Sequence, residues 1–199
     1  MAIRKLRVPA LRLAFCLVGL LILFVRPRWP AEGATALAVE VAGYLLLLAG
    51  CGIRMWSILY LGGRKSKALV TQGPYSVCKN PLYVGTFLLA VGAPLCFENL
   101  AMLLASVLVV LPIHGLVAQR EERHLEQRFG EEYVSYQRRV RGFLPRFCDY
   151  CSPGTVEVSL RAVSRMAMEI GGFLMIPVVE DILELLHNHE VIPVLWHFP

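Results

Sequence analysis

Long apolar segments alternate with short polar ones along the chain, and this pattern predicts where its helices lie. A helix needs about 20 mostly apolar residues to cross the hydrocarbon core of a bilayer. Apolar runs at or near that length cover approximately residues 9–25, 35–61, 82–97 and 100–118. The sequence therefore predicts an all-α, polytopic integral membrane protein with four core transmembrane helices.

Proline, glycine and charged residues predict the helix boundaries. Pro81 suits the first turn of the third helix, where an N–H group would have no partner within the helix. Gly62 and Gly63 end the second helix. The fourth apolar run continues without a stop signal into a charged segment. That continuity predicts a helix over residues 118–139 that extends the fourth span beyond the bilayer.

Residues 147–199 differ in character from the core that we predict over residues 1–146. Apolar stretches after position 156 are interrupted by Arg161, Arg165 and Glu169, so that no single run has the length and composition of a span. Apolar residues at helical spacing near the C-terminus predict an amphipathic helix. We therefore expect a C-terminal helical appendage that is either interfacial or partly inserted into the membrane.

Composition and charge support the membrane assignment and exclude other classes. The mean hydropathy is +0.57 and 56% of the residues are hydrophobic, which is not typical of a soluble domain. The net charge of +5 comes from basic residues that flank apolar runs, which predicts contact with a lipid bilayer and not with nucleic acid. Basic residues are concentrated in the first 12 positions, between positions 64 and 79, and after position 119. The positive-inside rule therefore predicts a multi-pass protein whose N-terminus and both later segments, including the helix over 118–139, are cytoplasmic.

The sequence lacks the short motifs of soluble cofactor-binding and hydrolytic enzymes. It has no glycine-rich phosphate loop, zinc-protease motif or serine-hydrolase elbow. Among its six cysteines, only Cys148 and Cys151 have the spacing of a metal or redox pair. With no second pair of this kind, we predict no metal site.

Two polar segments lie beside the third and fourth helices. The first runs from Gly73 to Gly85 with the sequence GPYSVCKNPLYVG, and the second runs from Glu121 to Pro145. Charged groups and irregular backbone are costly next to bilayer hydrocarbon, which offers them no hydrogen-bond partners. We therefore predict that the two segments form the two halves of one active site at the cytoplasmic membrane face.

These segments resemble the isoprenylcysteine carboxyl methyltransferase and phospholipid methyltransferase superfamily of integral membrane enzymes. In the first segment the matching residues are Gly73, Pro74, Tyr75, Asn80, Pro81, Tyr83 and Gly85. In the second they are Glu121, Glu122, Leu125, Phe129, Gly130, Tyr133, Tyr136, Val140, Phe143, Leu144 and Pro145. The resemblance covers about residues 70–145. It implies S-adenosyl-L-methionine as cofactor, bound between the loop before the third helix and the end of the fourth, and a lipophilic acceptor substrate that arrives from the bilayer.

The resemblance and the chemistry of the residues together give a candidate cofactor site. The N–H groups in the helix turn after Pro81 suit a carboxylate, aromatic rings suit the adenine, and carboxylates suit ribose hydroxyls or an ammonium group. The predicted cofactor-binding residues are Tyr75, Asn80, Pro81, Leu82, Tyr83, Gly85, Glu121 and Glu122. Alternatively, Gly85 serves helix packing and the two glutamates form part of a solvated helix face.

Arg54 and Asn80 are the predicted catalytic residues. Arg54 lies within the second apolar span, where a charge needs a partner; the alternative is that it snorkels to the membrane surface. Asn80 stands where the family often has histidine, and Gly142 stands where it has arginine. The alternative for the second position is that Arg141 or Arg146 replaces that arginine through an adjustment of the backbone. These two departures argue against isoprenylcysteine as the substrate. Tyr133 and Tyr136 are expected to be interfacial anchors and not catalytic groups.

The predicted function is transfer of a methyl group to a thiol, carboxylate or amine on a lipophilic or small acceptor at the cytoplasmic face. Such a transfer depends on positioning and exclusion of water more than on an acid–base pair. Two alternatives stay open: a non-catalytic membrane scaffold of the same fold, and a sterol-type reductase that uses NADPH. The reductase motif normally has glutamate where this chain has Thr86.

Overall fold

The computed structural model describes residues 25–27, 33–62, 68–140, 142–143, 145–189, 191 and 196–198. The predicted first span at 9–25 lies outside the described residues except for its last position, and so do the basic residues at 64, 65 and 67 and Arg141. Within the described ranges the regular elements are helices apart from two three-residue strands. These strands, β1 (Val25–Pro27) and β2 (Trp196–Phe198), pair in parallel.

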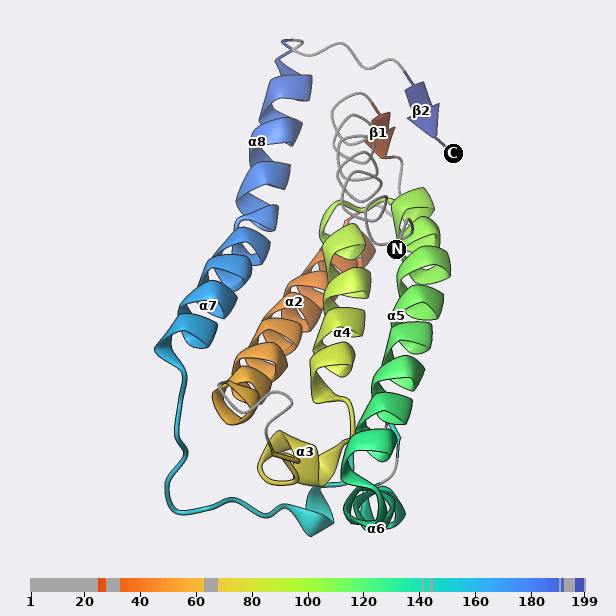
Figure 1. Cartoon of the computed structure of the whole chain (residues 1–199). Helices are drawn as coiled ribbons and strands as arrows, with labels where there is room; N and C mark the ends of the chain where they lie inside the picture. Colours follow the sequence, from red (N-terminus) through yellow and green to blue (C-terminus); the bar gives the residue numbers. More distant parts are fainter. Residues whose placement is uncertain are drawn as a thin grey trace, which may run out of the picture.

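Three helices form the centre of the fold. They are α2 (Ala34–Leu61), α4 (Pro81–Cys96) and α5 (Leu100–Phe129), and α4 packs between the other two (Figure 1). By length and composition, α2 and α5 can cross a membrane, whereas α4 is a shorter apolar helix of 16 residues. Three of the four predicted spans therefore coincide with helices, and Pro81 begins α4 as predicted.

Glycines bring the backbones of α2 and α4 into direct contact. A methyl group added to Gly85 would lie 2.9 Å from the Gly50 carbonyl oxygen, and one added to Gly92 would lie 2.9 Å from the Gly43 oxygen. Gly43 and Gly50 are seven residues apart on α2, and Gly85 and Gly92 are seven residues apart on α4. This spacing is close to two helical turns, so all four glycines face the same interface. A buried cluster fills the space around them, formed by Leu47, Cys51, Leu89 and Cys96. The two helices thus form a closely packed platform.

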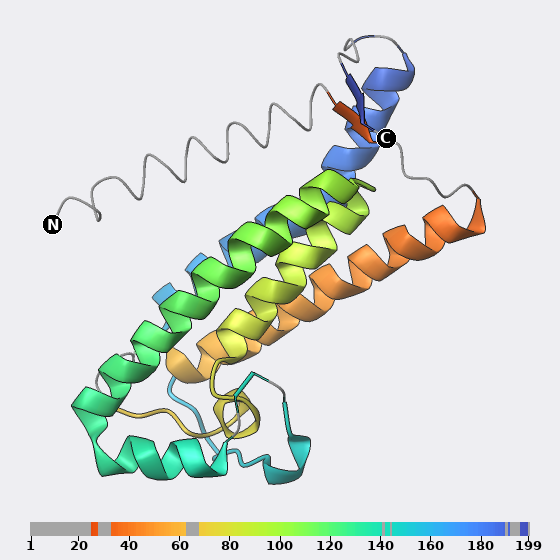
Figure 2. The ribbon, with the colours of Figure 1, turned by 90° about the vertical axis from the view of Figure 1, so that its right-hand side faces the viewer.

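The polar end of α5 differs from the sequence prediction. One helix was predicted over residues 118–139, but the structure divides it at Gly130, which has a φ of 53°. That positive φ is accessible to glycine at little cost, and it ends α5 before α6 (Glu131–Arg139) begins in a new direction (Figure 2). Helix α6 then lies beside the short helix α3 (Pro74–Val77) (Figure 1). The turn at Gly130 thereby closes the base of the pocket described below.

The C-terminal region forms two helices. After the 3₁₀ turn η1 (Phe147–Asp149), an extended stretch leads to α7 (Leu160–Leu174) and α8 (Ile176–Asn188). Helix α7 packs against α2, and α8 packs against α4. Ile170, Phe173 and Ile176 pack on the buried cluster between α2 and α4. The C-terminal pair is therefore packed against the core through α7 and the start of α8 (Figure 1).

Candidate active site

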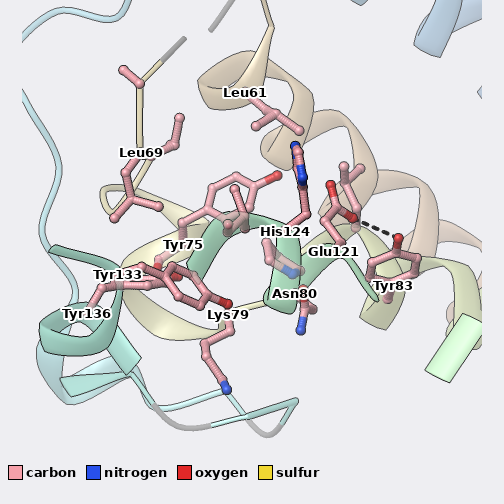
Figure 3. Close-up of a pocket in the computed structure, with 15 residues that line it drawn as sticks. Leu61, Leu69, Tyr75, Lys79, Asn80, Tyr83, Glu121, His124, Tyr133 and Tyr136 are labelled. Atoms are coloured by element: carbon pink, nitrogen blue, oxygen red, sulfur yellow. Dashed lines mark hydrogen bonds between the residues drawn. The ribbon is translucent and has the colours of Figure 1, made fainter. Parts of the chain in front are cut away.

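A pocket lies where the loop before α4, the first turn of α4, the polar half of α5 and helix α6 meet (Figure 3). It is formed mainly by the two polar segments that the sequence analysis paired. The lining residues are Leu61, Ala68, Leu69, Val70, Tyr75, Lys79, Asn80, Pro81, Leu82, Tyr83, Glu121, His124, Leu125, Tyr133 and Tyr136. Six of the eight residues predicted to bind a cofactor are in this set: Tyr75, Asn80, Pro81, Leu82, Tyr83 and Glu121.

Two adjacent glutamates of α5 hold the start of α4. The Tyr83 hydroxyl donates a hydrogen bond of 2.8 Å to the Glu121 carboxylate (Figure 3). The Asn80 amide donates one of 2.8 Å to Glu122, and the Lys79 ammonium lies 3.5 Å from the same carboxylate. Asn80 is the N-cap residue of α4, yet its side chain makes no capping hydrogen bond. The side chain is directed to α5 instead, so these contacts fix the relative position of the two pocket walls.

Tyr75 presents an unusual group to the pocket. Its side chain is only 8% exposed, and its hydroxyl has no hydrogen-bond partner among the described residues. Burial raises the pKa of this phenol, and the negative charge of Glu121 raises it further. The hydroxyl therefore keeps its proton and remains a donor. A buried polar group without a partner costs free energy, so its presence in a pocket is typical of a ligand site.

Helix α6 supplies two tyrosines that the sequence analysis interpreted as interfacial anchors. In the structure Tyr133 and Tyr136 are buried, at 1% and 3% exposure, and both line the pocket. The Tyr136 hydroxyl donates a hydrogen bond of 2.7 Å to the Tyr75 carbonyl and so holds α3 in place. Burial, reinforced by the charge of Glu122, raises the pKa of Tyr133 to about 12. Their places in the family motif were the available signal for a site role.

The remaining predicted site residues lie beside the pocket and not in its lining. Glu122 acts on it through Asn80. Gly85 faces α2, where a methyl group on it would lie 2.6 Å from the Arg54 Cγ atom. Arg54 donates a hydrogen bond of 2.8 Å to the Thr86 hydroxyl and forms an ion pair with Glu169. This charge on the apolar helix α2 therefore has its partners within the protein.

Several lining residues were not proposed from the sequence. His124 lies three residues after Glu121 on α5, and this spacing places both on one helix face. Lys79 directly precedes the predicted site residue Asn80, but Lys79 itself was not predicted to line the pocket. Leu61 closes the pocket from the end of α2, and nothing in the local sequence distinguishes it from other leucines of that helix. Among the described residues, no group of three or more His, Cys, Asp or Glu side chains is arranged to hold a metal ion.

Comparisons with known proteins match most of this chain. Residues 39–132 match the phospholipid methyltransferase family. The cobalt-zinc-cadmium resistance protein CzcN of Cupriavidus metallidurans is 33% identical over 171 residues, which cover 86% of this chain and 78% of that protein. The nickel-cobalt-cadmium resistance protein NccN of Alcaligenes xylosoxydans xylosoxydans is 33% identical over 160 residues, or 80% and 73% of the two chains. No solved structure matches the chain.

A further relative has an enzyme name. The protein-S-isoprenylcysteine O-methyltransferase of Rattus norvegicus is 29% identical over 117 residues, which cover 54% of this chain and 41% of that enzyme. Together with the two apolar helices α2 and α5, these matches define a membrane protein of a methyltransferase class. The chain belongs to the isoprenylcysteine carboxyl methyltransferase and phospholipid methyltransferase superfamily, as its motifs predicted. Membership implies a methyl donor of the S-adenosylmethionine type.

Proposed function

We propose that the protein transfers a methyl group from S-adenosyl-L-methionine to a lipophilic or small acceptor at the cytoplasmic face of a membrane. The observation that carries this proposal is the partnerless Tyr75 hydroxyl, buried in a pocket that both family motifs line. The hydroxyl is a donor and the nearby Glu121 carboxylate is an acceptor. A ligand with both acceptor and donor groups therefore fits this pocket.

Residues of the pocket match the parts of this cofactor. Tyr75 suits an acceptor atom, and Glu121 suits ribose hydroxyls or an ammonium group. The apolar side chains of Leu61, Leu69 and Leu125 offer surface for an adenine ring. The first turn of α4, at Pro81 and Leu82, lies at the positive end of the helix dipole and suits a carboxylate. When bound, the cofactor supplies a methyl group that its positive sulfonium makes electrophilic.

The residues of the site act mainly by positioning the reactants and not by transferring protons. Glu121 and Glu122 fix the start of α4 through Tyr83 and Asn80, so the pocket wall is pre-organised before an acceptor arrives. The negative charge of Glu121 favours a positively charged ligand nearby. Tyr75, Tyr133 and Tyr136 keep their protons because their pKa values are raised, and we assign none of them as a general base. Arg54 and Asn80 remain our candidates for orienting the acceptor, which is a thiol, an amine or a carboxylate.

We further propose that the core, residues 1–146, crosses the membrane four times with its N-terminus in the cytoplasm, and that residues 147–199 are an appendage to it. Basic residues near the pocket support this orientation, because arginine and lysine are enriched on the cytoplasmic side of membrane proteins. The pocket then opens toward the compartment that holds a water-soluble cofactor. An acceptor dissolved in the bilayer reaches the same site from the side.

Equilibrium binding of S-adenosylhomocysteine and NADPH to the detergent-purified protein tests the proposal. We expect saturable binding of S-adenosylhomocysteine and none of NADPH. Binding of NADPH alone would favour the sterol-type reductase. A protein that is folded by circular dichroism but binds neither compound would favour the non-catalytic scaffold. Incubation with tritiated S-adenosylmethionine and membrane lipid extracts then asks which lipid fraction acquires the label.

The resistance proteins among the relatives suggest a cellular context for the same activity. CzcN and NccN are named for resistance to divalent metals, and they align with most of this chain. We propose that methyl transfer by this protein supports growth in such metals. The test is growth of a deletion strain in cobalt, zinc and cadmium salts with the wild-type or the Glu121→Ala chain restored. Full rescue by Glu121→Ala would separate the resistance role from cofactor binding.

A further inference from the structure

Arg54 joins three helices through its guanidinium group. It projects from α2, donates a hydrogen bond of 2.8 Å to the Thr86 hydroxyl of α4, and pairs with the Glu169 carboxylate of α7. The Arg54 side chain is 17% exposed, whereas the Glu169 side chain is 54% exposed. The arginine is therefore enclosed within the bundle, whereas its counterion Glu169 lies on the solvent-accessible side of the pair. Glu169 belongs to α7, which contains none of the family motifs.

This ion pair is connected to the wall of the pocket. The Thr86 hydroxyl, which accepts from Arg54, itself donates a hydrogen bond of 2.9 Å to the Leu82 carbonyl. Leu82 lines the pocket. Gly85 lies between these two residues and leaves room for the Arg54 side chain against the α4 backbone. A continuous set of polar contacts thus leads from α7 to the first turn of α4.

The pair lies on the side of the pocket from which a membrane-dissolved acceptor arrives. Arg54 precedes the lining residue Leu61 by seven positions, which puts it on the same face of α2 and about 10 Å farther from the polar end. In the proposed topology this direction leads into the bilayer. An acceptor that reaches the pocket from the lipid side passes the half-exposed Glu169 carboxylate before it reaches Arg54.

The two cationic side chains described above near the start of α4 already have carboxylate partners. Arg54 is paired with Glu169, and Lys79 is paired with Glu122. An anionic head group could use Arg54 only by displacing Glu169, and separating a partly buried ion pair is costly because each charge loses its partner. In addition, Gly142 occupies the position of the family arginine. The site is thus arranged against a carboxylate in the acceptor.

We propose that Glu169 is a positioning residue that holds Arg54 on Thr86 and thereby selects against acceptors with anionic head groups. This inference rests on the proposed function and narrows it: of the three acceptor classes, it retains amines and thiols and removes carboxylates. It also gives the C-terminal pair a direct part in the acceptor side of the site. The negative charge of Glu169 next to the approach route favours a cationic head group by the same argument.

The test compares two fluorescent amphiphiles that share a dodecyl chain and a fluorophore and end in a carboxylate or a primary amine. Each is titrated into the full-length protein in phosphatidylcholine nanodiscs, with empty nanodiscs as the control for partitioning into lipid. We expect the wild-type protein to prefer the amine. Glu169→Gln frees Arg54 for a charge-assisted hydrogen bond, so it should strengthen carboxylate binding by about tenfold or more. Glu169→Asp should keep the wild-type preference.

The double variant Arg54→Gln/Glu169→Gln separates charge selection from a change of packing. It should lose the gained carboxylate affinity, because the gain depends on a free arginine. An unchanged carboxylate-to-amine ratio in Glu169→Gln, or a gain that persists in the double variant, would overturn the inference. S-adenosylhomocysteine binding is measured in the same samples. Its absence in the wild-type protein would refute the proposed function, whereas the amphiphile ratios report on Glu169 independently.

Discussion

The Asn80 amide of α4 donates a hydrogen bond of 2.8 Å to the Glu122 carboxylate of α5, across 42 positions of sequence. The adjacent Glu121 accepts a hydrogen bond from Tyr83 in the same way. One motif therefore contributes the start of a helix, and the other contributes the two carboxylates that fix it. Neither segment forms a pocket by itself, which explains why the family signal requires both.

The two glutamates are expected to differ in their effect on cofactor binding. Glu121→Ala removes a lining carboxylate, and loss of a charge-assisted hydrogen bond should weaken S-adenosylhomocysteine binding by about tenfold or more. Glu122→Ala should weaken it less, because Glu122 acts through Asn80. The matched control is Glu126→Ala, one turn farther along α5 and exposed. Isothermal titration calorimetry measures all four affinities, and wild-type affinity in both variants would exclude the pair from the site.

Tyr75→Phe separates ligand binding from stability. The hydroxyl has no partner in the fold, so its removal should leave the thermal unfolding midpoint unchanged or slightly higher. If the hydroxyl serves the cofactor, S-adenosylhomocysteine affinity should fall by about two- to tenfold. Tyr136→Phe is the opposite control, because it removes the bond to the Tyr75 carbonyl and should lower the midpoint. A lower midpoint with unaltered affinity in Tyr75→Phe would contradict the assignment.

Gly85→Ala tests the contact between α2 and α4. The added methyl group would lie 2.9 Å from the Gly50 carbonyl oxygen, and a backbone atom cannot move aside without displacing its helix. Overpacking of this kind should destabilise the protein by about 1–3 kcal/mol. At Gly115 a methyl group would meet nothing within 4 Å, so Gly115→Ala should be neutral or stabilising by up to about 1 kcal/mol. Equal midpoints for the two variants in thermal unfolding would show that the contact is loose.

Local sequence signals were sufficient to predict where the helices around the site begin and how far they extend. Pro81 predicted the start of α4, and apolar runs predicted the extents of α2, α4 and the first part of α5. The turn at Gly130 was missed, because charged residues at helical spacing continue on both sides of it. The positive φ that ends α5 belongs to one glycine, and the residue pattern around it gives no sign of that conformation.

Long-range partners could not be predicted from local pattern. The sequence indicated that Arg54 needs a partner, but Glu169 lies 115 positions away in a region with no family motif. Tyr133 and Tyr136 were interpreted as interfacial anchors because an aromatic residue near a membrane boundary suits either a lipid interface or a pocket. Only the packing of α6 beside α3 decides between these environments, and in the structure both rings are buried.

Alkaline pH should destabilise the fold through its buried tyrosines. The pKa of Tyr133 is raised to about 12, and burial raises the pKa of Tyr75 and Tyr136 as well. An unfolded chain releases these protons near pH 10. The stabilisation is therefore fully present below pH 10 and is lost as the pH rises toward 12. The thermal unfolding midpoint should therefore fall from pH 8 to pH 10 and pH 11, and it should fall less steeply in Tyr133→Phe. If the midpoint depends on pH equally in both proteins, Tyr133 is not a source of the alkaline destabilisation.

The proposed orientation of the core can be tested with single cysteines in a background that lacks the native ones. Basic residues near the pocket predict that cysteines at Thr71 and Ser135 react only with a membrane-impermeant maleimide added from the cytoplasmic side. Gly33, at the opposite end of α2, should react only from the other side. Labelling of Thr71 and Gly33 from the same side would exclude a spanning α2.

The same experiment decides whether the C-terminal pair is interfacial or inserted. Helices α7 and α8 run beside α2 and α4 toward the end of the bundle where α2 begins (Figures 1 and 2). Residues 170–179, at the junction of α7 and α8, carry no charge, so they can lie in hydrocarbon while Arg54 of α2 pairs with Glu169. A cysteine at Asn188 should therefore react from the same side of the membrane as one at Gly33. A cysteine at Gly154 should react from the same side as one at Thr71. If Asn188 labels from the cytoplasmic side instead, the pair does not cross with α2, and the route past Glu169 would lie at the membrane surface.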